Sequence, residues 1–184
     1  MKTKKTVSPV RFIASAIIIV LIATSCNMKD KPKPPVQFNE GKEQDAQFLI
    51  SAAEINLEEI QLGQMAQTKS VMPDVKDLGK MMEAEHTAAL KDLKILATTK
   101  HVNLPETPSQ DGQDAYNNLN NKNASEFDKT YCDMMVTGHT GVIEKFEKEA
   151  QDATDPDIRT WATNMIPILK IHLEHAVACQ KARE

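Results

Sequence analysis

The chain has 184 residues, with nine Met, 4% aromatic residues and a formal net charge of −4. This length suits one domain with its own core, and a composition poor in aromatic residues but rich in Met favours packed helices over a β-sandwich. Acidic and basic residues are mixed along the chain and form no basic stripe, so a nucleic-acid partner is not expected. Small molecules, metal ions and proteins remain as classes of ligand.

The first 26 residues have the layout of a secretory signal. A basic start, MKTKK, precedes an apolar run from Phe12 to Ile22, and the sequence ATSC then ends at Cys26. This resembles a bacterial lipoprotein signal, in which Cys26 would be lipidated and become the first mature residue, although Ala23 stands where Leu is more usual. The alternative is a transmembrane anchor, but the run is shorter than the roughly 20 residues that a spanning helix needs. We therefore expect a lipid-anchored protein of the cell envelope, periplasmic or at the outer membrane.

A proline-rich stretch separates this signal from the folded part. Residues 27–44 contain three prolines and many charged residues, with little to bury, so we expect a flexible tether there. The folded domain is predicted over residues 45–182.

Four later segments show apolar residues at helical spacing. The first runs from Asp45 to about Gln67, and the second follows Pro73, which suits a first helical turn. The third is predicted to start near Ser125 as its N-cap, and the fourth follows a tight turn at Asp155. The sequence therefore predicts an all-α fold with four long helices.

The connection between the second and third helices is long, from about Thr98 to Asn123, and one short helix is predicted at about residues 113–119. A connection of this length between helices usually has a role. If it runs back along the bundle, the second and third helices start at the same end. That topology is a ferritin-like four-helix bundle with a long crossover between helices 2 and 3.

Each long helix carries one polar side chain on its apolar stripe, and these residues are Glu59, His86, His139 and His172. In an antiparallel hairpin, two residues equally far from the turn lie at one level. Glu59 and His86 are equally far from a first turn centred between residues 72 and 73, and the other two are equally far from the second turn. With a returning crossover both pairs share one level, which predicts a common site.

One carboxylate and three imidazoles suit zinc, copper or iron as the bound metal. The alternative is a buried polar layer without metal, in which the four groups hydrogen-bond one another or water; either arrangement gives every buried group a partner. A full di-iron site is disfavoured, because only Glu83 and His86 form the Glu-x-x-His motif and Leu169 stands three residues before His172. No nucleophile motif or phosphate-binding loop supports a hydrolase or a kinase.

The helices also contain four short motifs in a fixed order: AAEINLEEIQLGQMA at 52–66, EHTAAL at 85–90, FDKTYCDMMVTGH at 127–139 and IPILKIHLEHA at 166–176. They resemble the bacterial domain-of-unknown-function family four-one-four-two, exported proteins with a predicted ferritin-like fold. By this similarity Glu59, His86, His139 and His172 stand at family motif positions, and Glu85 replaces the Asp more usual before the first histidine. The resemblance implies a fold and an exported location, and it implies no reaction.

With Cys26 assigned to lipid, one pair of cysteines is left. Cys132 and Cys179 are equally far from the second turn, and each is seven residues from the histidine on its own helix. Because disulfides persist in an envelope compartment, we expect these two to be bonded, a link worth roughly 4 kcal/mol in the chain-entropy model. The alternative is two buried free thiols.

Together these features predict an exported, lipid-anchored, ferritin-like protein that binds a metal in its core, with a role in metal handling or oxidative stress of the cell envelope. Two alternatives stay open. One is a structural or protein-binding envelope module whose polar layer fixes helix register without metal. The other is a metal-dependent oxidoreductase. The sequence predicts neither a substrate nor a protein partner, and leaves open whether the protein is an enzyme.

Overall fold

The computed structural model of the protein describes residues 40–184. This part is all helical and contains α1 (Glu40–Lys69), α2 (Pro73–Lys100), α3 (Gln110–Asn120), α4 (Ala124–Asp152) and α5 (Pro156–Lys181). The predicted all-α class is confirmed. The predicted signal segment with Cys26, and the tether as far as residue 39, lie outside the described residues. None of the five helices is long and apolar enough to cross a membrane.

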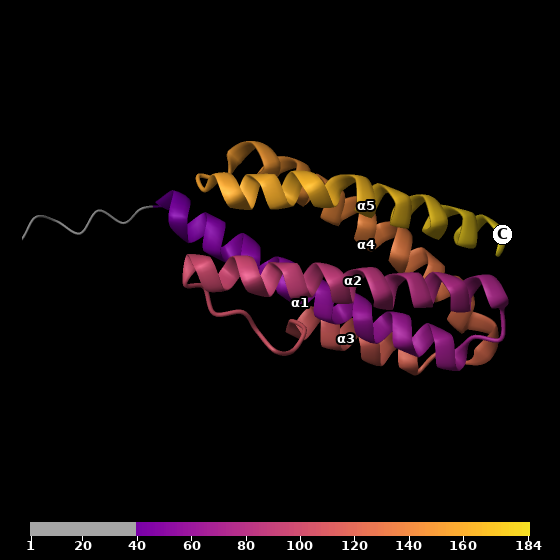
Figure 1. The fold of residues 1–184 in the computed structure, drawn as a ribbon. Coiled ribbons are helices and arrows are strands. Elements are labelled where there is room, and N and C mark those ends of the chain that lie inside the picture. Colours follow the sequence, from indigo (N-terminus) through magenta and orange to yellow (C-terminus); the bar gives the residue numbers. More distant parts are fainter. Residues whose placement is uncertain (1–39) are drawn as a thin grey trace, which may run out of the picture. The chain divides into compact units, whose positions relative to one another are not determined.

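The four long helices form two hairpins, α1 with α2 and α4 with α5, which lie side by side (Figure 1). Ion pairs show that α2 and α5 run in opposite directions. At one end Lys100 on α2 contacts Asp155 at 2.7 Å and Asp157 at 2.6 Å, and at the other end Arg183 contacts Asp74 at 2.8 Å. The end of α2 therefore meets the start of α5, and the start of α2 meets the end of the chain.

The connection after α2 returns along the bundle and includes α3 (Figure 1). This short helix begins after Ser109, whose Oγ accepts a hydrogen bond from the backbone N–H of Gly112 at 3.2 Å, and it is longer than predicted. Its last residue, Asn120, lies beside the end of α1, where Lys69 donates to the Asn120 backbone oxygen and to its Oδ1. Consequently α4 starts at the end of the bundle where α2 also starts.

Helix α1 begins earlier than the sequence predicted, at Glu40 rather than near Asp45. Acidic residues in its first turn interact favourably with the helix dipole. Asp45 itself is buried, and its carboxylate accepts hydrogen bonds from the backbone N–H groups of Thr154 and Asp155, both at 2.9 Å. This contact fixes the start of α1 against the turn between α4 and α5.

Helix α4 also begins before the predicted position. Its N-cap is Asn123, whose Oδ1 accepts from the backbone N–H of Ser125 at 3.0 Å and of Glu126 at 3.1 Å. Ser125 is therefore inside the first turn and is not the cap. Both residue types are good caps, and the Asn two residues earlier is the one that the backbone uses.

The apolar core consists of two clusters of buried side chains. One contains the rings of Phe48 and Phe146, against which the half-buried Trp161 packs, and the other contains several Met side chains together with Cys132 and Cys179. On α2, α4 and α5 the residues of one cluster precede a buried histidine and those of the other follow it. A polar layer therefore separates the two halves of the core.

Candidate metal centre

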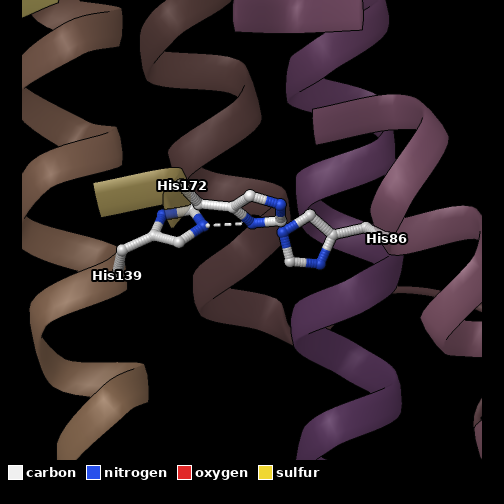
Figure 2. A group of neighbouring side chains, drawn as sticks. All are labelled: His86, His139 and His172. Carbon is white, nitrogen blue, oxygen red and sulfur yellow. Dashed lines mark hydrogen bonds between the residues drawn. The ribbon is translucent and has the colours of Figure 1, made fainter. Parts of the chain in front are cut away.

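Three histidines from three different helices face one another in this polar layer (Figure 2). They are His86 on α2, His139 on α4 and His172 on α5, and each is at most 2% exposed. One ring nitrogen of each lies within 4.8 Å of those of the other two. The structure thus brings together three of the four residues that the sequence predicted to form a site.

The proton on His86 is assigned by its hydrogen bond to α1. Its Nδ1 lies 2.9 Å from Oδ1 of Asn56, and the amide nitrogen of Asn56 donates to the backbone oxygen of Ala52 at 2.7 Å. The Asn56 oxygen can only accept, so Nδ1 of His86 carries the hydrogen. Nε2 then has a free lone pair, and among the described residues it has no hydrogen-bond partner.

The other two histidines are fixed in the same way by acceptors. Nδ1 of His139 donates to the backbone oxygen of Met135 at 2.9 Å, and Nε2 of His172 donates to Oε2 of Glu85 at 2.9 Å. A carbonyl and a carboxylate only accept hydrogen bonds, so the remaining nitrogens, Nε2 of His139 and Nδ1 of His172, carry lone pairs. All three outward-facing N–H groups are satisfied, and all three lone pairs point into the cluster.

Two of these lone pairs face each other without a proton between them. Nε2 of His139 and Nδ1 of His172 are 3.3 Å apart, and lone pairs at this distance repel unless a cation lies between them. Two nitrogens bound to one zinc ion in tetrahedral geometry are also about 3.3–3.4 Å apart. Metal-bound histidines commonly donate their second N–H to a carbonyl or carboxylate, as these do. The arrangement is therefore suited to hold one metal ion with three neutral imidazoles.

Burial keeps these imidazoles neutral by lowering their pKa values. Burial lowers the pKa of His139 to about 4, with a further contribution from His172. Burial also holds the pKa of His86 well below its ordinary value, and it lowers that of His172, although Glu85 partly offsets the effect there. Near pH 7 the lone pairs are therefore free to bind a metal.

Glu59, the fourth predicted residue, lies outside the group of converging nitrogens. It is 6% exposed, and its Oε1 is 4.0 Å from Nδ1 of His139, the nitrogen that faces away from the other histidines. Burial, and to a smaller extent the charge of Glu58, raises the pKa of Glu59 to about 8. Its Oε2 has no hydrogen-bond partner in the described part of the chain. A role of Glu59 as metal ligand stays a prediction.

The position of Glu59 follows from the register of the first hairpin. Asn56 and His86 are each 15 residues from Val71, and Gly63 and Gly79, whose backbones touch, are each eight residues from it. The turn is therefore centred on Val71 and not between residues 72 and 73, because α1 continues to Lys69 and α2 starts at Pro73.

The residue level with His86 is consequently Asn56, which the sequence analysis missed. A signal was present, since Asn56 lies four residues after Ala52 and three before Glu59, on the same buried face. Glu83 does not join the site: its carboxylate accepts from Gln64 at 2.8 Å and from Gln67 at 2.6 Å. The Glu-x-x-His motif of the sequence therefore supplies only its histidine.

The two remaining cysteines lie on the same side of the histidines. The Cα atoms of Cys132 and Cys179 are 5.7 Å apart, and the structure joins their sulfurs in a disulfide. This separation is within the usual range for such a bond. The link connects α4 to α5.

Comparison with known proteins adds a family and no reaction. The chain matches the family model described as Domain of unknown function (DUF4142) over residues 31–179. No similar protein is found among curated proteins, and none among solved structures. Because the match spans most of the sequence, including all three histidines, the chain belongs to the DUF4142 family.

Proposed function

We propose that this protein binds one metal ion through His86, His139 and His172 in the core of a ferritin-like bundle. The observation that carries the proposal is the convergence of three lone pairs whose ring N–H groups are all held by outward acceptors. A polar layer that served only to satisfy buried groups would instead place a proton between neighbouring nitrogens.

The ferritin-like assignment is supported by the path of the chain. Two antiparallel hairpins are joined by a long connection that brings the starts of α2 and α4 to the same end. Ferritin-like bundles have one such long crossover and build metal sites in the bundle core from side chains on facing helices.

The types of ligand atom narrow the choice of metal. Three neutral imidazoles without a carboxylate suit zinc or copper, and iron(II) usually has at least one carboxylate ligand. Zinc and copper are therefore the first candidates and iron(II) the third. A metal held by only three protein groups keeps a position for an exchangeable ligand, which suits metal handling.

The proposed location is the cell envelope, where the protein would be lipid-anchored through Cys26 and act in metal handling or oxidative stress. The support is the lipoprotein-like signal in the sequence. Replacing Cys26 by Ser should abolish labelling of the protein by fatty acid in growing cells, and unchanged labelling would remove this anchor from the account.

The rival function is an envelope module with a buried polar layer and no metal. Among the described residues Nε2 of His86 has no partner, and no proton lies between His139 and His172, so this module would need water molecules in the cluster. Without them the arrangement costs free energy, because unpaired buried polar groups lose their hydration without compensation.

Metal analysis separates these two functions. The protein is purified without a histidine tag, exposed to zinc, copper and iron(II) in turn, desalted and analysed by elemental mass spectrometry; we expect about one ion per chain. Replacing His172 by Leu should reduce the content to traces, whereas the matched change His175→Leu, at an exposed position on the same helix, should leave it unchanged. Trace amounts in the unmodified protein with all three metals would refute the metal function.

A further inference from the structure

The three histidines are buried, so an ion that binds them must pass the side chains around them. A pocket of about 370 Å³ opens between α1 and α4 beside this cluster. Its lining includes Glu58 and Glu59 from α1 and Thr130, Asp133, Thr137 and Gly138 from α4. Most of these residues offer oxygen atoms, which are the groups that replace the hydration shell of a divalent cation.

Glu59 belongs both to this pocket and to the surroundings of the histidines. It lines the pocket, and its Oε1 is 4.0 Å from Nδ1 of His139. Its Oε2 is buried and accepts no hydrogen bond from the described residues. A buried carboxyl oxygen without a hydrogen-bond partner lowers the stability of the fold. A cation bound to this oxygen would remove that cost.

The α4 side of the pocket leaves this carboxyl group uncovered. Gly138 faces it, and a Cβ at this position would have Oε1 of Glu59 at 3.7 Å as its nearest neighbour. A side chain at residue 138 would therefore begin in van der Waals contact with the carboxyl group. The glycine keeps the passage between pocket and carboxyl group open.

We propose that divalent metal cations reach the histidine cluster through the pocket between α1 and α4, with Glu59 as a transient first ligand. Glu58 adds negative charge to the lining and raises the local concentration of cations, whereas the charge of Asp133 is offset by Lys129 at 3.2 Å. From Glu59 the ion passes around the ring of His139, whose Nδ1 faces Glu59 and whose Nε2 faces His172. This inference rests on the proposed metal function and concerns the route to the same site.

A second carboxylate, Glu85, approaches the cluster from the other side and is the competing route. Its side chain is 45% exposed, and its Oε2 lies 2.9 Å from Nε2 of His172. That oxygen already accepts the hydrogen of His172 and thereby fixes the lone pair on Nδ1. Binding an ion there would disrupt the hydrogen bond that prepares the site, so Glu85 is a positioning residue.

The rate of metal uptake tests the route. The full-length protein in detergent is mixed with cobalt(II), a coloured substitute for zinc, and the absorbance is followed by stopped flow. We expect Glu59→Gln and Gly138→Leu to load about tenfold or more slowly while reaching the same final occupancy. The first replaces the carboxyl group, which releases its proton when it binds a cation, by an amide of the same shape, and the second adds a side chain beside the carboxyl group. Glu144→Gln, at an exposed position of α4 that does not line the pocket, is the matched control and should load at the rate of the unmodified protein.

The outcomes distinguish the route from the metal function. If the unmodified protein binds no cobalt(II), zinc or copper, the metal function fails and the route with it. If it binds metal and Glu59→Gln loads at the unmodified rate, only the route is refuted. A loss of final occupancy in Glu59→Gln would make Glu59 a permanent ligand and would also overturn the transient role. Equally slow loading in Glu144→Gln would show that the effect is a general loss of negative charge and would also refute the route.

Discussion

The two helical hairpins supply the same site but are held together by different means. The α4–α5 hairpin is cross-linked by Cys132 and Cys179, and its two histidines lie directly opposite each other. The α1–α2 hairpin has no such link among the described residues, and its backbones touch at Gly63 and Gly79. The register of the α4–α5 hairpin is therefore set by a disulfide, and that of the α1–α2 hairpin by the close contact of two glycines.

The site is complete only where the hairpins meet. The α4–α5 hairpin contributes two of the lone pairs, and the third comes from His86 on α2. The contact between Glu85 on α2 and His172 on α5 joins the two hairpins at this level. Changes that loosen either hairpin should therefore affect metal binding as well as folding.

Removing the disulfide should have the largest effect on stability. The bond spans a sequence separation of 47 residues, for which the chain-entropy model gives about 4 kcal/mol. We expect the double variant Cys132→Ser/Cys179→Ser to lose up to that amount in urea unfolding of the metal-free protein. Reductant should destabilise the unmodified protein and not the variant. Identical unfolding midpoints for the two proteins, or two free thiols in mass spectrometry of the unreduced protein, would contradict the cross-link.

The second largest expected effect is that acid lowers the unfolding free energy through His139 on α4. The folded pKa of His139, about 4, lies below the ordinary value of 6.5, so between these pH values the unfolded chain binds a proton that the native protein does not. Stability contributed by neutral His139 is therefore present above pH 6.5 and is lost as the pH falls towards 4, by up to about 3 kcal/mol.

The contribution of Glu59 on α1 to the unfolding free energy should change with pH in the opposite direction. The folded pKa of Glu59, about 8, is above its ordinary 4.5, so its contribution is lost as the pH rises through 8. The unmodified protein and the variant His139→Leu are compared, both without metal. Because Glu59 is present in both proteins, its contribution cancels when their pH dependences are subtracted. The unfolding free energy at pH 7 minus that at pH 5 should be more positive in the unmodified protein than in the variant. Equal differences in both proteins would show that His139 is not held neutral.

The contrast between the hairpins also explains which parts of the site could be predicted. The turn at Asp155 and Pro156 is short and strongly marked, so counting residues from it placed His139 opposite His172. The first turn has no comparable marker on its α1 side, and a centre misplaced by one or two residues put Glu59 where Asn56 lies.

Other features of the site depend on contacts that a single sequence does not reveal. The lone pair of His139 is assigned by the backbone oxygen of Met135, and that of His86 by the orientation of the Asn56 amide. Both require the final positions of helices and side chains. Apolar spacing predicted which residues face the core, but it could not predict which ring nitrogen of each histidine would carry the hydrogen.

A side chain at the contact of α1 and α2 should destabilise the less constrained hairpin. A Cβ at Gly79 would lie 2.7 Å from the backbone oxygen of Gly63 and 2.9 Å from Cβ of Ala66, so the two helices would have to separate. We expect Gly79→Ala to cost about 1–3 kcal/mol of unfolding free energy. Gly141→Ala on α4 is the matched control, because no atom lies within 4 Å of its Cβ, and it should be neutral or slightly stabilising. Equal stability of the two variants would mean that the close approach is not needed.

The smallest expected effect is on metal affinity, after loss of the hydrogen bond by which Asn56 on α1 orients the ring of His86. Replacing Asn56 by Leu removes the acceptor of the Nδ1 hydrogen while all three metal-binding nitrogens stay in place. Loss of such a partner typically lowers metal affinity by about 10- to 100-fold, because the imidazole can then rotate or carry its proton on the wrong nitrogen. Asn56→Asp keeps an acceptor at the same position and should bind more tightly than Asn56→Leu. Competition with a chelator measures all three affinities, and the final occupancy should stay at about one ion per chain. If Asn56→Leu bound metal as tightly as the unmodified protein, the hydrogen bond between Asn56 and His86 would have no part in preparing the site.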